Sequence, residues 1–235
     1  MKPEEAMAAA AKRVAEKSKP HPHRFSKAYV SNLARCGAKH LLGLESFQSN
    51  SLRAFLFFTQ AAQFGHPGAC YELGVMYATG VPGVCELDAE QASQHFMVAA
   101  ESGLPSAQYN LAFFYEQGRG VSKNANRAVE LWERAAEQGH TKARCMLAER
   151  YFRGRATFGD STFGALEQDY AAAIFYWGLA ADDGEPKAIH ALAIMHEAGL
   201  GVAQSTKLAL ELYDLAAFAW SQQHPVRIKR TIIQL

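Results

Sequence analysis

The 235-residue chain lacks a long apolar run. No stretch of about 18 apolar residues occurs, because even the alanine-rich segment 171–181 is followed at once by Asp182 and Asp183. A helix that spans a membrane needs about 20 such residues. We therefore expect a soluble protein without a transmembrane segment.

Cysteine is scarce and follows no motif. There is no Cys-x-x-Cys pair and no fixed cysteine position in a repeat, whereas disulfide-stapled helical repeats need a regular pair. His190 and His196 lie six residues apart, on different faces of a helix, so they do not match zinc-ligand spacing. We expect no metal, no other cofactor and a reducing compartment. The four cysteines are Cys36, Cys70, Cys85 and Cys145.

The first residues lack the apolar core of a secretory signal. An alanine-rich, basic stretch resembles a mitochondrial presequence weakly, because Glu4, Glu5 and Glu16 dilute its charge. We expect residues 1–24 to form a helix followed by a proline-containing linker. The expected location is intracellular, in the cytosol or the mitochondrial interior, and not secreted.

Catalytic motifs are also missing. The sequence has no nucleophile elbow, no His-Glu-x-x-His and no phosphate-binding loop, so we predict no catalytic residue and no small-molecule substrate. Positive charge is concentrated at the two ends, and the body between them carries about −6. An acidic body repels phosphate, which argues against nucleic-acid binding. The basic ends leave open a contact with an acidic protein or an anionic membrane surface.

One pattern returns five times between residues 50 and 220. Each copy has a helix-capping residue, an alanine four positions later, an aromatic residue four after that, and an alanine pair. The spacing between successive anchoring alanines is 38, 36, 45 and 36 residues, which is typical of helical repeats. The capping residues are Asn50, Asp88, Asn124, Asp169 and Ser205; the anchors are Ala54, Ala92, Ala128, Ala173 and Ala209; the aromatics are Phe58, Phe96, Trp132, Trp177 and Tyr213.

A second pattern alternates with the first, as in Ala69, Leu73, Gly74 and Tyr77, whose spacing keeps these residues on one helical face. Between the two kinds of helix, a glycine suits the end of one helix and a proline the start of the next. These boundaries are Gly65-His-Pro67, Gly103-Leu-Pro105 and Gly184-Glu-Pro186, with Gly139-His-Thr141 as a variant. The anchoring alanines are expected where helices cross, and each aromatic residue is expected to fill the gap to the neighbouring unit.

The combined motif Ala-x-x-x-Leu-Gly-x-x-Tyr, Gly-x-Gly-Val, then Asp-x-x-x-Ala-x-x-x-aromatic-x-x-Ala-Ala-x-x-Gly resembles the Sel-one-like repeat, a relative of the tetratricopeptide repeat. The resemblance covers about residues 32–220. In the first unit, Cys36, Gly37 and His40 replace the Leu, Gly and Tyr. The resemblance implies an all-α fold, a right-handed α-solenoid of about five helix–loop–helix repeats over residues 25–221, followed by a tail at 222–235.

Candidate binding positions follow from helix geometry. If Ala, Leu and Tyr of each first helix face the core, the positions three and six after the alanine point away, toward the inner surface of the superhelix. Their mixed character suits a helical or extended peptide, although superhelical curvature can instead bury some of them. These residues are Glu72, Val75, Asn110, Phe113, Met146, Glu149, Ala191 and Ile194.

Further candidate binding residues lie where the repeat pattern is interrupted or ends. About nine extra residues follow Gly154 and carry Phe158 and Phe163, and an insertion of this kind often projects from a binding face. The tail contains Arg227, Lys229 and Arg230 and either binds a partner or caps the last helix pair.

The resemblance also implies a function. Members of the family act as adaptors or scaffolds in multiprotein assemblies, including endoplasmic-reticulum degradation machinery, bacterial signalling and respiratory-chain assembly. We expect a non-catalytic scaffold that binds protein subunits or peptides, as an accessory subunit or assembly factor of a larger complex, such as a mitochondrial respiratory assembly. The alternative is a regulatory adaptor that recruits short peptides to its concave surface.

Overall fold

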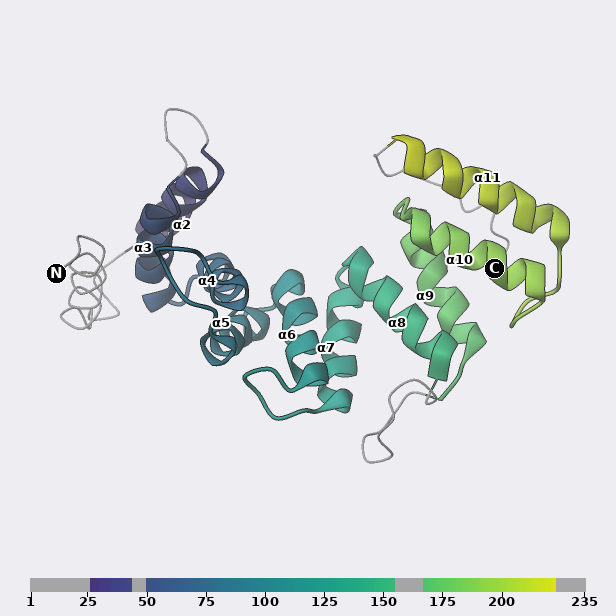
Figure 1. The fold of residues 1–235 in the computed structure, drawn as a ribbon, viewed down its shortest axis with the longest axis horizontal. Coiled ribbons are helices and arrows are strands. Elements are labelled where there is room, and N and C mark those ends of the chain that lie inside the picture. Colours follow the sequence, from purple (N-terminus) through teal and green to yellow (C-terminus); the bar gives the residue numbers. More distant parts are fainter. Residues whose placement is uncertain (1–25, 44–49, 155–166, 223–235) are drawn as a thin grey trace. The chain divides into compact units, whose positions relative to one another are not determined.

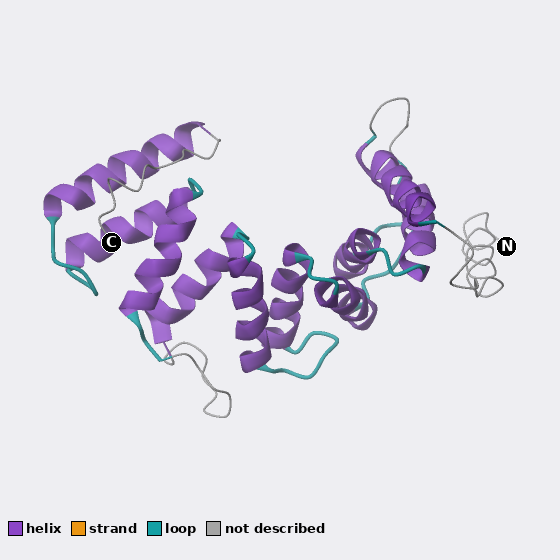
Figure 2. Ribbon diagram, turned by 180° about the vertical axis from the view of Figure 1, so that it is seen from behind, coloured by secondary structure: helices purple, strands orange, loops and turns teal. Residues whose placement is uncertain are grey.

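The computed structural model describes residues 26–43, 50–154 and 167–222, and within these ranges the chain forms ten α-helices and no β-strand (Figures 1 and 2). The predicted all-α fold of paired helices is therefore confirmed. Residues 1–24, the inserted Phe158 and Phe163, and the basic tail residues Arg227, Lys229 and Arg230 lie outside the described residues.

Contacts divide the chain into two units, of which the first ends at Lys123 and the second begins at Asn124. In each unit, every helix packs against the helix before it and the helix after it in the sequence. The first unit contains α2 (Lys27–Leu42), α3 (Ser51–Gln63), α4 (Pro67–Thr79), α5 (Ala89–Glu101) and α6 (Pro105–Gln117). The second unit contains α7 (Ala125–Glu137), α8 (Thr141–Arg153), α9 (Tyr170–Asp182), α10 (Pro186–Ala198) and α11 (Thr206–Gln222).

The five predicted capping residues each cap a helix. The Asn50 side chain accepts a hydrogen bond from the Arg53 N–H at 2.9 Å, and Asp88, Asn124, Asp169 and Ser205 accept equivalent bonds. A cap of this kind stabilises a helix by about 1 kcal/mol. The boundary glycines that precede the other helices have φ between +71° and +88°, the left-handed conformation predicted for a helix end.

Two further caps were not predicted. His66 and His140 each accept a hydrogen bond through Nδ1, from the backbone N–H of Ala69 and Ala143, at 3.2 Å in both cases. The nitrogen can accept only while it carries no proton, so these two helix starts depend on neutral histidine.

Phe58 and Phe96 each pack against a glycine of their own repeat. A Cβ added to Gly74 of α4 would lie 2.6 Å from the Phe96 ring of α5, and Gly37 stands in the same relation to Phe58. Phe96 also reaches the next repeat, where its ring centroid lies 5.3 Å from that of Phe114. Phe96 therefore makes the predicted contact with the neighbouring unit, in addition to its contact with Gly74 of its own repeat.

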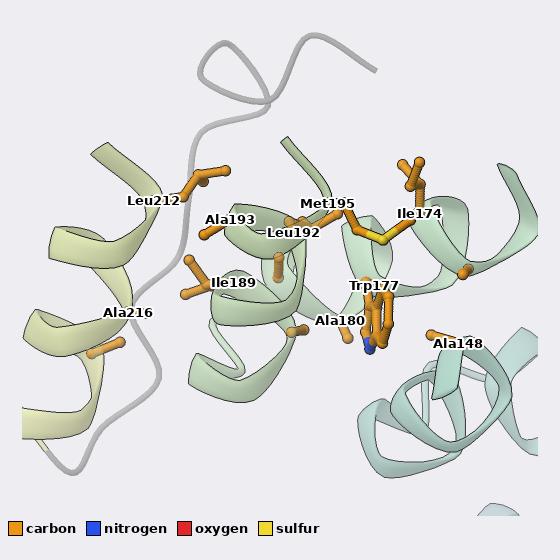
Figure 3. Packing of buried hydrophobic residues seen from close by; sticks show 14 residues of the cluster. Ala148, Ile174, Trp177, Ala180, Ile189, Leu192, Ala193, Met195, Leu212 and Ala216 are labelled. Atoms are coloured by element: carbon orange, nitrogen blue, oxygen red, sulfur yellow. The ribbon is translucent and has the colours of Figure 1, made fainter. Parts of the chain in front are cut away.

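The core of the second unit is built mainly from alanine and aliphatic side chains (Figure 3). Small residues on α9 and α10 let these helices approach closely, and the Trp177 ring fills the space beside Ala148 of α8. The buried cluster continues through Ile189 and Leu192 to Leu212 and Ala216 of α11. Buried residues of this core therefore hold the helix pairs of the second unit together.

Candidate interaction surfaces

The candidate binding residues at positions three and six after each alanine, which we call the stripe residues, lie at or near the surface. Ile194 is 38% exposed and the other members are half-buried. They are therefore neither core residues nor fully solvated. Because the chain forms two units, the stripe is described separately in each.

In the first unit, α4 and α6 carry polar and apolar stripe residues. Burial raises the pKa of the Tyr71 hydroxyl of α4 and the nearby Glu72 carboxylate raises it further, whereas the Asn110 side chain of α6 lies close enough to lower it. Val75 lies one turn after Glu72, and Phe113 lies one turn after Asn110. We call this the α4–α6 surface, which consists of Tyr71, Glu72, Val75, Asn110 and Phe113.

Glu72 is the carboxylate that sets the chemistry of the α4–α6 surface. Its side chain is half-buried, and burial raises the pKa of its carboxyl group. Among the described residues, no lysine, arginine or histidine forms an ion pair with it. A half-buried carboxylate without a cation is unfavourably solvated, so a cationic group of a partner would stabilise it.

In the second unit, the stripe is more apolar. Glu149 of α8 forms an ion pair with Arg153 one turn further along the helix, which neutralises it. Met146 lies beside Glu149 on α8, and Ile194 is exposed on α10. Among the described stripe residues, the second unit therefore has no unpaired carboxylate equivalent to Glu72 of the first.

A recurring ring stack joins the two helices of several repeats and was missed from the sequence. His40 stacks on Phe57, Tyr77 on His95, and Tyr151 on Tyr176, with interplanar angles of 10°, 5° and 8°. In all three stacks, the second ring belongs to the residue just before the aromatic residue that recurs in every repeat. It varies in type between Phe, His and Tyr, so no single residue marks the position.

The structure offers no metal centre in its described part. In residues 26–43, 50–154 and 167–222, no group of three or more His, Cys, Asp and Glu side chains is placed to hold an ion. All four cysteines are free of disulfides. Burial raises the pKa of the Cys145 thiol to about 12, and it also raises the pKa of Cys70. These thiols therefore remain protonated at neutral pH.

None of the described helices combines the length and the apolar character that crossing a membrane requires. Figure 2 shows the helices joined by loops, without any sheet among the described residues. Paired helices with small residues at their crossings and mixed residues on their faces define a helical repeat scaffold.

The chain belongs to the Sel1 repeat family. The family pattern matches residues 33–66, 67–104, 105–140, 141–185 and 186–217, and each range corresponds to one pair of helices. The expected family is therefore confirmed, and so is the expected number of five repeats.

Relatives with curated descriptions share part of this chain. The rat "Protein sel-1 homolog 2" is 35% identical over 135 residues, which are 55% of this chain and 18% of the relative. The "Chitin synthase regulatory factor 2" of Schizosaccharomyces pombe is 29% identical over 175 residues, 71% of this chain and 32% of the relative. The chain thus spans a third or less of the length of these relatives.

Solved structures show the same fold. The c5321 protein, described as a protective antigen of uropathogenic Escherichia coli with an SLR fold, is 27% identical and aligns with a TM-score of 0.71 over 90% of this chain and 40% of its own. A Sel1 repeat protein from Oxalobacter formigenes aligns with a TM-score of 0.69 at 22% identity, over 91% of this chain and 80% of its own. The second likeness concerns the fold alone.

Proposed function

We propose that this Sel1 repeat chain is a non-catalytic scaffold that binds other proteins, as an accessory subunit or assembly factor of a larger complex. The observation that carries the proposal is the α4–α6 surface. It combines a half-buried, unpaired Glu72 carboxylate with the apolar Val75 and Phe113 side chains, and so offers contact area and one polar determinant.

A regulatory adaptor is the second candidate. Several relatives are described as chitin synthase regulators, which makes a regulatory role of this chain the natural alternative. A short peptide with an apolar face and one basic residue would match the α4–α6 surface. The two candidates differ in the lifetime of the complex, since an accessory subunit stays bound whereas an adaptor exchanges its peptides.

We propose a reducing intracellular compartment as the location, either the cytosol or the mitochondrial interior. Four cysteines without a disulfide support this proposal. The mitochondrial alternative includes a role in a respiratory-type assembly. Fractionation of cells followed by detection of the endogenous protein distinguishes the two compartments.

Co-purification tests the proposed function. A tagged chain is isolated under mild conditions and washed with increasing salt. A stoichiometric assembly that survives high salt supports the accessory subunit, and partners lost at moderate salt support the adaptor.

Two charge-reversal variants locate the contact. Glu72→Lys should release the partner, whereas the matched Glu101→Lys, at an exposed position on α5 of the same unit, should retain it. Equal recovery with both variants would show that the α4–α6 surface does not bind the partner.

A further inference from the structure

A face of the second unit lies where α7 and α9 both pack on α8. Arg144 of α8 donates to the Ala136 carbonyl oxygen of α7 at 3.2 Å and to the Leu179 carbonyl oxygen of α9 at 3.3 Å. It also forms an ion pair with Asp183 at 2.7 Å, which neutralises its charge. Tyr151 lies two turns further along the same face of α8. The side chains around Tyr151 therefore come from three helices.

Aromatic rings cover one side of this face. Tyr151 stacks on Tyr176 of α9, with centroids 5.8 Å apart and an angle of 8°. Phe175 packs edge-on against Tyr176 at 5.3 Å. Phe175 is 57% exposed, which leaves much of its ring in contact with solvent. A large exposed ring beside a fixed aromatic pair is typical of a recognition surface.

Carboxylates from α7 border the rings. Tyr151 hydrogen-bonds Glu133, and Glu130 and Glu137 lie one turn before and after Glu133 on the same helix face. Glu130 is paired with Arg127 at 2.8 Å. In the part of the chain that the structure describes, neither Glu133 nor Glu137 forms an ion pair. Arg134 points about 100° away from Glu133 around the helix, and it lies one turn before Glu137 without pairing with it.

The arrangement is electrostatically unfavourable without a cation. Burial raises the pKa of the Glu133 carboxyl group, and repulsion from Glu137 and Glu130 raises it further. The same glutamates help to raise the pKa of Tyr176. A positive charge placed between α7 and α9 would reverse these effects, because an opposite charge favours the ionised carboxylate. The surface is therefore complementary to a cationic group.

We propose that the α7–α9 surface, formed by Glu133, Glu137, Tyr151, Phe175 and Tyr176, binds an arginine side chain from a segment of a partner protein. A guanidinium group donates several hydrogen bonds in one plane, which suits two carboxylates on one helix face. Its flat face can also stack on an exposed ring such as Phe175. An ammonium group makes fewer of these contacts at once, so arginine is preferred to lysine.

The inference rests on the proposed interaction role, but it uses residues of the second unit only. The test therefore separates the two proposals. Glu72→Lys should leave arginine binding unchanged, and Glu133→Gln should leave a partner of the α4–α6 surface bound. If the arginine peptide does not bind while a partner is still lost on Glu72→Lys, only the α7–α9 proposal fails; if the peptide binds but no partner depends on Glu72, only the α4–α6 proposal fails.

The probe is a short peptide with two arginines, Ac-Ala-Arg-Ala-Ala-Arg-Ala-amide, titrated into the 235-residue chain and followed by NMR. Saturable shifts are expected for the backbone amides of Glu133, Glu137, Phe175 and Tyr176. A twin peptide with citrulline, which has the same shape without the charge, should produce no such shifts. A lysine twin should bind more weakly than the arginine peptide. Equal binding of the citrulline or lysine twin would contradict the proposal.

Variants with matched controls test the residues. Glu133→Gln should weaken binding of the arginine peptide about tenfold, and Phe175→Ala about threefold. The controls are Glu101→Gln on α5 and Phe218→Ala on α11, where the ring is 52% exposed. Both should leave the affinity unchanged. Equal weakening by a control and its counterpart would show diffuse attraction and overturn the proposed site.

The titration of Glu133 provides a second readout. Saturation with the arginine peptide should lower the pKa of the Glu133 carboxyl group toward its ordinary value, measured from the carboxyl 13C shift. An unchanged pKa under saturation would mean that the peptide binds elsewhere. Glu133→Gln should fold normally, because it removes a carboxylate whose ionisation is unfavourable in the folded state.

Discussion

The close contact between Gly74 and Phe96 gives the sharpest prediction about stability. In Gly74→Ala, the new Cβ would lie 2.6 Å from one carbon of the Phe96 ring and 2.7 Å from the next. Carbon atoms in ordinary contact are about 3.5–4.0 Å apart, so the ring must move by about 1 Å. Overpacking of this kind costs about 1–3 kcal/mol.

Helix propensity acts in the opposite direction. Alanine in place of glycine inside a helix stabilises by about 1 kcal/mol. The net effect of Gly74→Ala is therefore a loss of about 0–2 kcal/mol in the free energy of unfolding. With Phe96→Leu as the background, the ring is gone and the same exchange should stabilise by about 1 kcal/mol.

Urea unfolding followed by circular dichroism measures all four members of this double-mutant cycle. The expected coupling between Gly74 and Phe96 is about 1–3 kcal/mol. If Gly74→Ala stabilises the natural chain as much as it stabilises the Phe96→Leu variant, the ring does not restrict this position. The account of repeat packing given above would then be wrong.

Three further predictions concern helix ends, helix crossings and the α7–α9 surface. The pKa of His140 is lowered by burial and by Lys142. Its helix cap therefore stabilises the fold fully above pH ~6.5, and this contribution is lost as the pH falls. Unfolding measured at pH 5 and 7.5 should show that this pH dependence disappears in His140→Asn. Ala135→Leu should overpack a fully buried position and cost about 1–3 kcal/mol, and an unchanged melting curve would contradict this. The raised pKa of Glu133 means that its contribution to stability is present at low pH and is lost as the pH rises through that pKa. Glu133→Gln should therefore gain stability relative to the natural chain as the pH rises from 4 to 8. A difference in free energy of unfolding that stays constant over this range would contradict the assignment.

The sequence predicted the helix pairs well because their signals are local. A capping side chain acts on the next three residues, and anchoring alanines recur at helical spacing, so Asp88 and Ala92 could be assigned without any tertiary information. The caps at His66 and His140 were missed because histidine is rarely used in this position and its role depends on the protonation state of Nδ1.

The candidate surfaces were less predictable because they depend on distances between helices. Periodicity placed Glu72 and Asn110 on equivalent faces, but only the structure shows that Asn110 of α6 lies close enough to Tyr71 of α4 to affect its pKa. Likewise, Glu133 and Tyr151 are 18 residues apart in the sequence and belong to different repeats, so their hydrogen bond could not be inferred from either repeat alone.

The affinity between the purified chain and the partner obtained by co-purification tests the central claim most directly. It is measured for the natural chain, for Glu72→Lys and for Glu101→Lys at the same ionic strength. The account predicts a dissociation constant at least about tenfold higher for Glu72→Lys and an unchanged value for Glu101→Lys. Equal dissociation constants for the three proteins would contradict recognition through the α4–α6 surface.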